Sequence, residues 1–446
     1  MKNDMLKWSV LTILSVICFC ITLYFGDYYL KVFYLIALCI STIIVTKSQY
    51  TFSAINGFYI GTLAFVLLPA LFFYNAAAGL IWIYAYIPKM QVSISEIESA
   101  VDIISLGLLL VTTTATLPRS YIIGAGILKQ TRKTVQLYKS SRKIDIVVIY
   151  AISTIALIYK TIVVGGNQYG DTPLDIVYAF ANSISSISAL ILISKKKELI
   201  YKLLFSFLFA PSIYYGIVSL NRGTFLTIVL LILVTIFQLR LKGLKLIIIF
   251  VIGYFFTSYI SYDLVNYRTE GRAKQLIGDN YLTSLASESI MVPTMGLVVR
   301  ELDLGRVSFQ NGTDLILIPA YFIPRVLWPS KPLPLDYRLN REIGMNTGTP
   351  FGTPITVYGG MYINGGYYGY ILLMLALGLI IRRLVYTPDL IVSVLLFTYF
   401  IDLVRVGDIA RETVTVSIWL VSYKLLSTPL VTRKSEVGKI IGARTW

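Results

Sequence analysis

The run Tyr28-Tyr-Leu-Lys-Val-Phe-Tyr-Leu-Ile-Ala-Leu-Cys-Ile-Ser-Thr-Ile-Ile-Val-Thr46 contains a single charged residue, Lys31. A helix that crosses the hydrocarbon core of a bilayer needs about 17 to 25 predominantly apolar residues. This run has that length and that composition, so we expect it to cross a membrane as a helix. The same criterion, applied outward along the chain, predicts the fold class.

Apolar runs of this kind recur throughout the chain, which is 56% hydrophobic and only 14% charged over 446 residues. In soluble domains about a quarter of the residues are charged, so this composition indicates an integral membrane protein. We predict an all-α polytopic membrane protein with about 12 transmembrane helices. The segments are expected at residues 8–25, 28–46, 54–74, 100–117, 144–164, 174–194, 200–219, 223–239, 243–262, 355–381, 388–404 and 412–430.

The lysines and arginines alternate between successive connections, which predicts the orientation of the chain. With the N-terminus inside, the cytoplasmic connections and the tail hold 23 cations, whereas the short outer connections hold six. Cytoplasmic loops carry the excess of positive charge, so both termini are expected in the cytoplasm. Three parts follow: 1–262 with nine spans, 263–354 as one large extracytoplasmic (periplasmic) loop, and 355–446 with three spans and a cytoplasmic tail.

The composition also excludes several kinds of chemistry. The chain has no histidine, which excludes histidine catalysis and histidine metal sites, and its three cysteines all lie in the first two apolar runs. No Gly-rich nucleotide loop and no carboxylate spacing typical of a metal site occurs, so we expect no cofactor and no metal. The net charge of +16 reflects cations at membrane edges, where they meet anionic lipids, and does not indicate nucleic acid.

The predicted outer loop contains a stiff and basic stretch. Seven of the fifteen prolines lie between Pro319 and Pro354. Proline fixes φ and removes a backbone donor, so this stretch cannot form one continuous helix. It carries four cations, Arg325, Lys331, Arg338 and Arg341. We interpret it as a shaped functional loop next to a membrane. Its preceding part, near residues 282–300, has helix-like apolar spacing and could lie along the interface.

Five further arginines occur on the predicted outer side, where the topology would otherwise exclude cations: Arg222, Arg268, Arg272, Arg405 and Arg411. Arginine presents a planar fork that fits a phosphate with two hydrogen bonds, which favours a site for a lipid-linked pyrophosphate. The alternative is that these arginines reach lipid phosphates or pair with neighbouring acids, namely Glu270, Asp402, Asp408 and Glu412. An acid on the same side could also act as a general base.

Two other features lie near the end of the proline-rich stretch. The spacing Gly365-Gly-Tyr-Tyr-Gly369 is typical of close helix packing and does not favour a phosphate loop. The tyrosines at 358, 362, 367 and 368 could stack on sugar rings, although interfacial aromatic belts explain most tyrosines in such a protein.

Four short motifs together resemble the O-antigen polymerase family, the oligosaccharide repeat-unit polymerases of bacterial surface polysaccharides. They are Tyr321-Phe-Ile-Pro-Arg-Val-Leu-Trp-Pro-Ser-Lys-Pro332, Gly352-Thr-Pro354, Asn221-Arg222-Gly223 and Ala410-Arg411-Glu412. About a dozen spans with one large outer loop late in the chain also fit that family, and the resemblance covers about the last half of the chain.

The resemblance implies a glycosyltransferase with a GT-C-like architecture in the bacterial inner membrane. It would act on undecaprenyl-pyrophosphate-linked glycans, transferring the growing chain onto a new lipid-linked repeat unit. Its partners would be membrane lipids, a flippase and a chain-length regulator. We assign catalysis to Arg222, Arg411 and Glu412. Substrate binding is assigned to Arg268, Arg272, Arg325, Lys331, Arg338 and Arg405.

Two other functions remain alternatives. An O-antigen ligase has a related architecture but typically carries a histidine in its outer loop, which this chain lacks. A lipid-linked oligosaccharide flippase, which is a transporter, would also have about twelve spans, but its cations would line a cavity among the spans.

Overall fold

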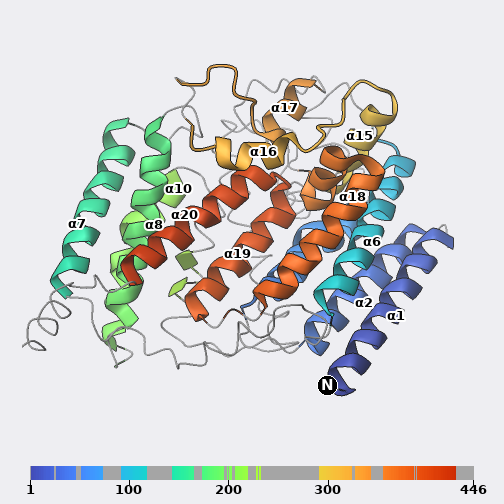
Figure 1. Ribbon diagram of the computed structural model, residues 1–446, viewed down its shortest axis with the longest axis horizontal. Helices are drawn as coiled ribbons and strands as arrows, with labels where there is room; N and C mark the ends of the chain where they lie inside the picture. Colours follow the sequence, from blue (N-terminus) through green and yellow to red (C-terminus); the bar gives the residue numbers. More distant parts are fainter. Residues whose placement is uncertain are drawn as a thin grey trace, which may run out of the picture. The chain divides into compact units, whose positions relative to one another are not determined.

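The computed structural model describes residues 2–24, 27–46, 52–73, 92–117, 143–164, 173–194, 206–218, 291–323, 327–342, 355–385 and 389–427, with a few isolated residues between them. Over these ranges every regular element is a helix, and no strand occurs (Figure 1). The all-α prediction is therefore confirmed for the described part of the chain.

The chain divides into two compact units. Unit 1 comprises residues 1–132 and 239–416. Its helices are α1 (Lys2–Tyr24), α2 (Tyr28–Val45), α3 (Ala54–Thr62), the π-helical turn η1 (Leu63–Leu67), α4 (Leu68–Phe73), α6 (Ile94–Ala115), α15 (Met291–Asp303), α16 (Thr313–Ala320), α17 (Leu335–Glu342), α18 (Thr356–Leu384), α19 (Leu390–Val406) and the first part of α20 (Ile409–Ser427).

Unit 2 comprises residues 133–238 and 417–446. Its described helices are α7 (Lys143–Tyr159) with the π turn η4 (Lys160–Val164), α8 (Pro173–Ser194), the 3₁₀ turn η5 (Ser206–Phe209), α10 (Ala210–Val218) and the end of α20. Small polar residues join these helices: Thr154 and Ser185 are 3.1 Å apart, and Ser183 and Ser422 are 2.7 Å apart, oxygen to oxygen. Small residues let apolar helices approach closely and hydrogen-bond across the contact.

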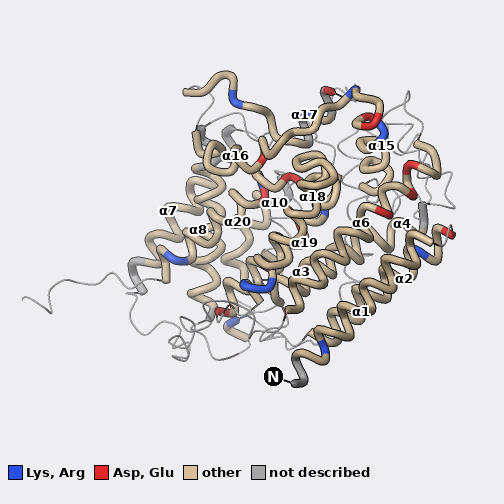
Figure 2. Tube along the Cα trace, turned by 45° about the vertical axis from the view of Figure 1, so that its right-hand side comes forward, with Lys and Arg blue, Asp and Glu red and all other residues tan. Residues whose placement is uncertain are grey.

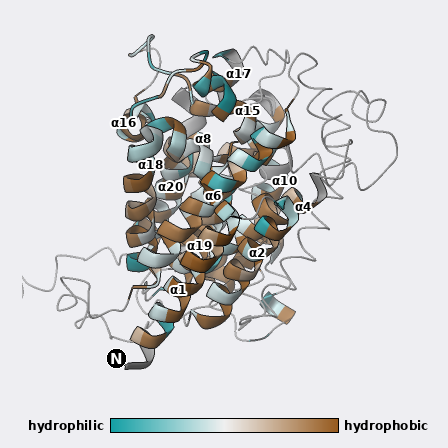
Figure 3. Ribbon diagram, turned by 90° about the vertical axis from the view of Figure 1, so that its right-hand side faces the viewer, coloured by the Kyte–Doolittle hydropathy of each residue, from teal (hydrophilic) through white to brown (hydrophobic). Residues whose placement is uncertain are grey.

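Four described helices are long and apolar enough to cross a membrane, namely Met5–Tyr24, Tyr28–Val45, Ala54–Leu71 and Thr356–Leu384. Much of the helical surface in Figure 3 is hydrophobic, whereas α17 is hydrophilic. Ten of the twelve predicted segments overlap described helices; the segment 223–239 is described only at a few isolated residues, and 243–262 lies outside the described residues. The chain is thus a helical membrane protein, while the count of twelve spans stays a prediction.

Two helices differ from what the sequence pattern indicated. We expected the region near 282–300 along the membrane interface. Its described part, α15, is instead buried on nearly every side, packed on α6 and α18. Gly296 makes this possible, because its missing side chain lets α15 approach the backbone of Glu96 in α6. Burial suits most of α15, because its first nine residues, Met291–Val299, include no charged side chain.

The second difference concerns the glycines of α18. The pattern Gly365 to Gly369 predicted close helix packing, but Gly366 has φ 60° and ψ −169°, which interrupts the helix. Gly369 has no neighbour within 4 Å of the position of a β-carbon. The glycines therefore break α18 into two pieces, because only glycine adopts this backbone conformation without a steric penalty.

Candidate functional site

The break in α18 leaves backbone carbonyls at the end of its first piece, Thr356–Gly365, without helical partners. A turn that contains Gln310 and Gly312 supplies the missing donors. The backbone N–H of Gln310 donates to the carbonyl of Ile363 at 2.8 Å, and that of Gly312 donates to the carbonyl of Asn364 at 2.9 Å. The turn before α16 is thereby fixed to α18 at the position where the helix is interrupted.

A buried polar network reinforces this junction. Asp314, at the start of α16, is fully buried, and its Oδ2 accepts from Nδ2 of Asn364 at 2.7 Å. The same amide donates to the carbonyl of Gly360 at 2.8 Å. Arg338 of α17 donates to Oδ1 of Asp314 and to Oε1 of Gln310. The carboxylate of Asp314 therefore links α16, α17 and α18.

The first piece of α18 also contacts the corner between α19 and α20. The backbone N–H of Ile355 donates to the carbonyl of Val406 at 3.3 Å, and Gly360 packs against the backbone of Gly407. Gly407 ends α19 in the left-handed conformation, with φ 78°. Asp408, the next residue, is the N-cap of α20: its Oδ1 accepts a hydrogen bond from the backbone N–H of Arg411 at 2.9 Å.

Charged side chains gather at this corner. Arg405 lies 3.3 Å from Asp402, nitrogen to oxygen, and Nε of Arg411 lies 3.2 Å from Oε1 of Glu412. Arg411 also interacts electrostatically with Asp402, so the two pairs form one cluster. We call Asp402, Arg405, Asp408, Arg411 and Glu412 the corner cluster.

The corner cluster is mostly shielded from solvent. The side chains of the two ion pairs are between 11% and 20% exposed, and Asp408 is buried. Each guanidinium group has a carboxylate partner, so the charges of Arg405 and Arg411 are compensated within the protein. Charges in such surroundings interact strongly, because little water screens them. In Figure 2 acidic and basic residues gather around α16 and α18, at one end of unit 1.

The proline-rich loop reaches the corner cluster through apolar contacts. Trp328 and Ile318 pack on a small core formed by Leu317, Ala320 and Ala410, and Ala410 directly precedes Arg411. Within the loop, Nζ of Lys331 donates to the carbonyls of Tyr321 at 2.9 Å and Ile323 at 3.1 Å. The loop and the start of α20 are thus parts of one packed structure.

The structure brings together some of the predicted site residues. Arg405, Arg411 and Glu412 share the corner cluster, and each arginine pairs with a carboxylate, as the alternative interpretation expected. Arg338 lies in α17 and donates to Asp314, and Lys331 lies in the proline-rich loop and donates to the carbonyl of Tyr321. Four predicted site residues lie outside the described residues: Arg222, Arg268, Arg272 and Arg325.

Two residues organise the junction, Asp314 and Asn364. Sequence reasoning counted Asp314 only among the outer acids that could pair with an arginine or act as a base, and it missed Asn364. Asn364 lies in the run Tyr-Ile-Asn-Gly-Gly, where an amide directly before two glycines could have indicated a helix end. Within the described ranges, no group of three or more acids or cysteines is arranged to hold a metal.

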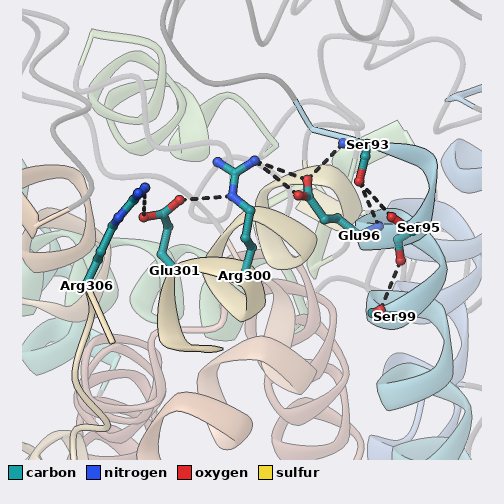
Figure 4. A network of polar contacts seen from close by, with 7 residues as sticks. All are labelled: Ser93, Ser95, Glu96, Ser99, Arg300, Glu301 and Arg306. Atoms are coloured by element: carbon teal, nitrogen blue, oxygen red, sulfur yellow. Dashed lines mark hydrogen bonds and ion pairs between the residues drawn. The ribbon is translucent and has the colours of Figure 1, made fainter. Parts of the chain in front are cut away.

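A second charged network joins α6 and α15. Glu301 of α15 is 1% exposed and accepts from Nε of Arg300 at 3.0 Å and from Nη1 of Arg306 at 3.4 Å. Arg300 also donates to Glu96, which caps the first turn of α6 together with Ser93 (Figure 4). An open cavity of about 160 Å³ lies beside this network. These contacts fasten α15 in place.

The fold and the charged clusters define a helical membrane protein with polar networks at one end of unit 1. Comparisons with protein-family models, with curated proteins and with solved structures found no match for this chain.

Proposed function

We propose that this chain is a membrane glycosyltransferase that polymerises oligosaccharide repeat units carried on undecaprenyl pyrophosphate. The observation that carries the proposal is the packing of Trp328 against the small core that contains Ala410. Two of the sequence motifs behind the resemblance, the proline-rich run and Ala410-Arg411-Glu412, are far apart in the chain but pack together. A scaffold would not require a stiff basic loop to lie against a cluster of shielded charges.

In the proposed reaction, a hydroxyl oxygen of the incoming repeat unit attacks the anomeric carbon of the growing chain. The bond from that carbon to the pyrophosphate oxygen breaks, and the lipid pyrophosphate leaves with the bonding electrons. The proton of the hydroxyl passes to a carboxylate, for which Glu412 is the candidate. Arginines lower the barrier by stabilising the negative charge that develops on the leaving group.

The ion pairs of the corner cluster fit this role in a specific way. Glu412 fixes the guanidinium of Arg411 from one side, through Nε, and the planar fork of arginine has further donors on its terminal nitrogens. A guanidinium that is held before substrate arrives loses less freedom when a phosphate binds. We further propose Arg222 as the second catalytic arginine, and Arg268, Arg272, Arg325, Lys331, Arg338 and Arg405 as substrate-binding residues.

The proposed setting is the bacterial inner membrane, with both termini in the cytoplasm and residues 263–354 on the outer side. The substrates, undecaprenyl-pyrophosphate-linked glycans, would enter at the level of the outer head groups. A flippase and a chain-length regulator are the expected protein partners. No metal or other cofactor takes part in the proposed mechanism.

The proposal is tested by replacing Arg411 with lysine, which keeps the charge but loses the planar fork. Hydrogen bonds to charged groups contribute about 1.5–3 kcal/mol, so Arg411→Lys should slow polymerisation roughly ten- to a hundred-fold. The measurement is the length of surface polysaccharide in cells that carry each variant at equal protein level. Cells should attach single repeat units to lipid A core in place of long chains. The matched control is Arg306→Lys, because the side chain of Arg306 is 66% exposed and does not belong to the corner cluster.

Two results would contradict the proposal. If Arg411→Lys and Arg411→Ala both kept the full ladder of long chains, Arg411 would have no role in polymerisation. If the single-unit product were lost as well, the step that fails would be export or ligation. That result would favour a flippase or a ligase.

A further inference from the structure

The helix α16 and the turn after it have their apolar residues on the outside. Asp314, Leu317 and Ala320 face the protein, at intervals of three residues. Of the positions between them, Leu315, Ile316 and Pro319 are exposed and Ile318 is partly buried; Phe322 and Ile323, in the turn after the helix, are exposed as well. Ile316 is 68% exposed, and Leu327 a little further on is 77% exposed. The one charged side chain of α16 is buried and its exposed positions are apolar, whereas a helix at a water-facing surface exposes polar residues.

This reversal has a physical consequence for the surroundings of α16. Leaving a large aliphatic or aromatic side chain in water forgoes about 1.5–3 kcal/mol compared with burying it. Five such side chains lie within thirteen residues: Leu315, Ile316, Phe322, Ile323 and Leu327. We call these five the α16 apolar face. Contiguous exposed apolar surface of this kind marks a site of contact with a membrane or another protein.

The charges and aromatic residues near the face favour the membrane. Between Leu315 and Leu335 the sequence has two cations, Arg325 and Lys331, and no acid, which complements anionic lipid phosphates. Tyr321 and Trp328 flank the face and are partly exposed. Tyrosine and tryptophan are enriched at membrane–water interfaces, where one end of the ring is apolar and the other is wet.

The α16 apolar face also belongs to a unit whose other surfaces are lipid-compatible. After its break, α18 exposes Tyr368, Leu372, Leu379 and Ile380, spaced as one side of a helix. In Figure 1, α16 lies across the end of unit 1 at which α18 and α20 begin. The buried face of α16 packs on Ala410, so the position of α16 relative to the corner cluster is fixed.

We propose that the α16 apolar face is a membrane-contacting surface, embedded at the boundary between head groups and acyl chains. The helix α16 then lies in the plane of the interface, and residues 313–323 together with Leu327 are part of the membrane-embedded body. This inference concerns contact with lipid and stands whether or not the chain is a polymerase. It has the consequence that the corner cluster, directly beneath α16, lies at the depth of lipid phosphates.

The test places a fluorescent reporter on the face in the full-length protein. Cys18, Cys20 and Cys39 are replaced by alanine, and single variants Ile316→Cys, Leu327→Cys and Ser308→Cys are labelled with an environment-sensitive dye. Ser308 is exposed in the same outer segment but lies outside the face, so it is the matched control. Each variant is reconstituted in vesicles of phosphatidylethanolamine and phosphatidylglycerol. Quenching is measured with aqueous iodide and with lipids that carry a doxyl group near the head group.

At Ile316 and Leu327 we expect blue-shifted emission, several-fold stronger quenching by doxyl lipid than at Ser308, and several-fold weaker quenching by iodide. Iodide quenching equal to that at Ser308 would overturn the proposal, because the face would then lie in water. Shielding from both quenchers would also overturn it, in favour of a second copy of the chain. Shielding that appears only after a polyprenyl pyrophosphate is added would overturn it in favour of a substrate tail. Two labelled positions guard against a local effect of either substitution.

Discussion

Gly360 in α18 packs directly against the backbone of Gly407, at the corner between α19 and α20. A β-carbon on Gly360 would overlap the carbonyl oxygen of Gly407, and one on Gly407 would overlap the carbonyl oxygen of Thr356. Gly407 also needs its left-handed φ of 78° to end α19. This contact holds the first piece of α18 beside Asp408, the member of the corner cluster that precedes α20.

Gly360→Ala should therefore destabilise the protein. The added methyl group meets backbone, which cannot rotate away as a side chain can, and overpacking of this kind costs about 1–3 kcal/mol. We expect a lower midpoint of thermal aggregation, measured by fluorescence-detected size-exclusion chromatography of detergent-solubilised protein. The contact would also be loosened, so the surface polysaccharide should be shorter.

The matched control is Gly369→Ala, in the same helix. No atom lies within 4 Å of the position of its β-carbon, and alanine in a helix is favoured over glycine by about 0.5–1 kcal/mol. This variant should be as stable as the parent or slightly more so. Equal thermal midpoints for the two alanine variants would show that the glycine contact is not a tight one.

The ion pair of Asp314 and Arg338 should behave as one energetic unit. Asp314→Asn keeps the contact with Asn364 but weakens the charged contact with Arg338, which is worth about 1.5–3 kcal/mol. We expect the region around α17 to open more often, so a glutamate-specific endoproteinase should cut faster after Glu342, at the end of α17, in solubilised protein. The rate of cleavage is read from the appearance of fragments with time.

A double-mutant cycle isolates this pair. Arg338→Leu should accelerate opening, and the double variant Asp314→Asn, Arg338→Leu should be less damaged than the sum of the single changes, because the same contact is lost only once. Strict additivity of the two effects would mean that the pair contributes nothing of its own.

Glu301 should matter more for stability than its arginine partners. Its carboxylate is buried and accepts from both Arg300 and Arg306. Glu301→Gln removes the charge that both cations face, and breaking a shielded ion pair on one side leaves the other charge uncompensated. We expect a loss of about 1–3 kcal/mol, seen as a lower thermal midpoint. Arg306→Ala, at a 66% exposed side chain, should cost less than about 1 kcal/mol. A larger effect of Arg306→Ala than of Glu301→Gln would contradict this assignment.

The predicted orientation can be checked in intact cells. Single cysteines at Ser330 and Ser308, in a background without the native cysteines, should react with a membrane-impermeant thiol reagent added from outside. Cysteines at Ser140 and Ser435, in segments with many cations, should react only after the cells are opened. Labelling of the second pair in intact cells would invert the topology and place the corner cluster on the cytoplasmic side.

The sequence by itself determined that this is a helical membrane protein and roughly where the helices lie. Apolar length is a local property, and α2 follows residues 28–46 almost to the residue because a run of nineteen residues is long enough to cross the hydrocarbon core. The sequence also singled out Arg405 and Arg411, because cations are rare in the outer connections of the predicted topology, and Glu412 through the motif Ala410-Arg411-Glu412.

Only the tertiary structure decided how these parts meet. Whether an arginine at a helix end faces a ligand or a carboxylate depends on residues far away in the chain, and here Arg405 and Arg411 each pair with an acid. The role of the glycines in α18 also required coordinates, because the same spacing permits either close packing or a break. Asp314 and Asn364 are fifty positions apart in the sequence, and they meet next to the break at Gly366. There the carbonyls of Ile363 and Asn364 accept hydrogen bonds from the turn before α16.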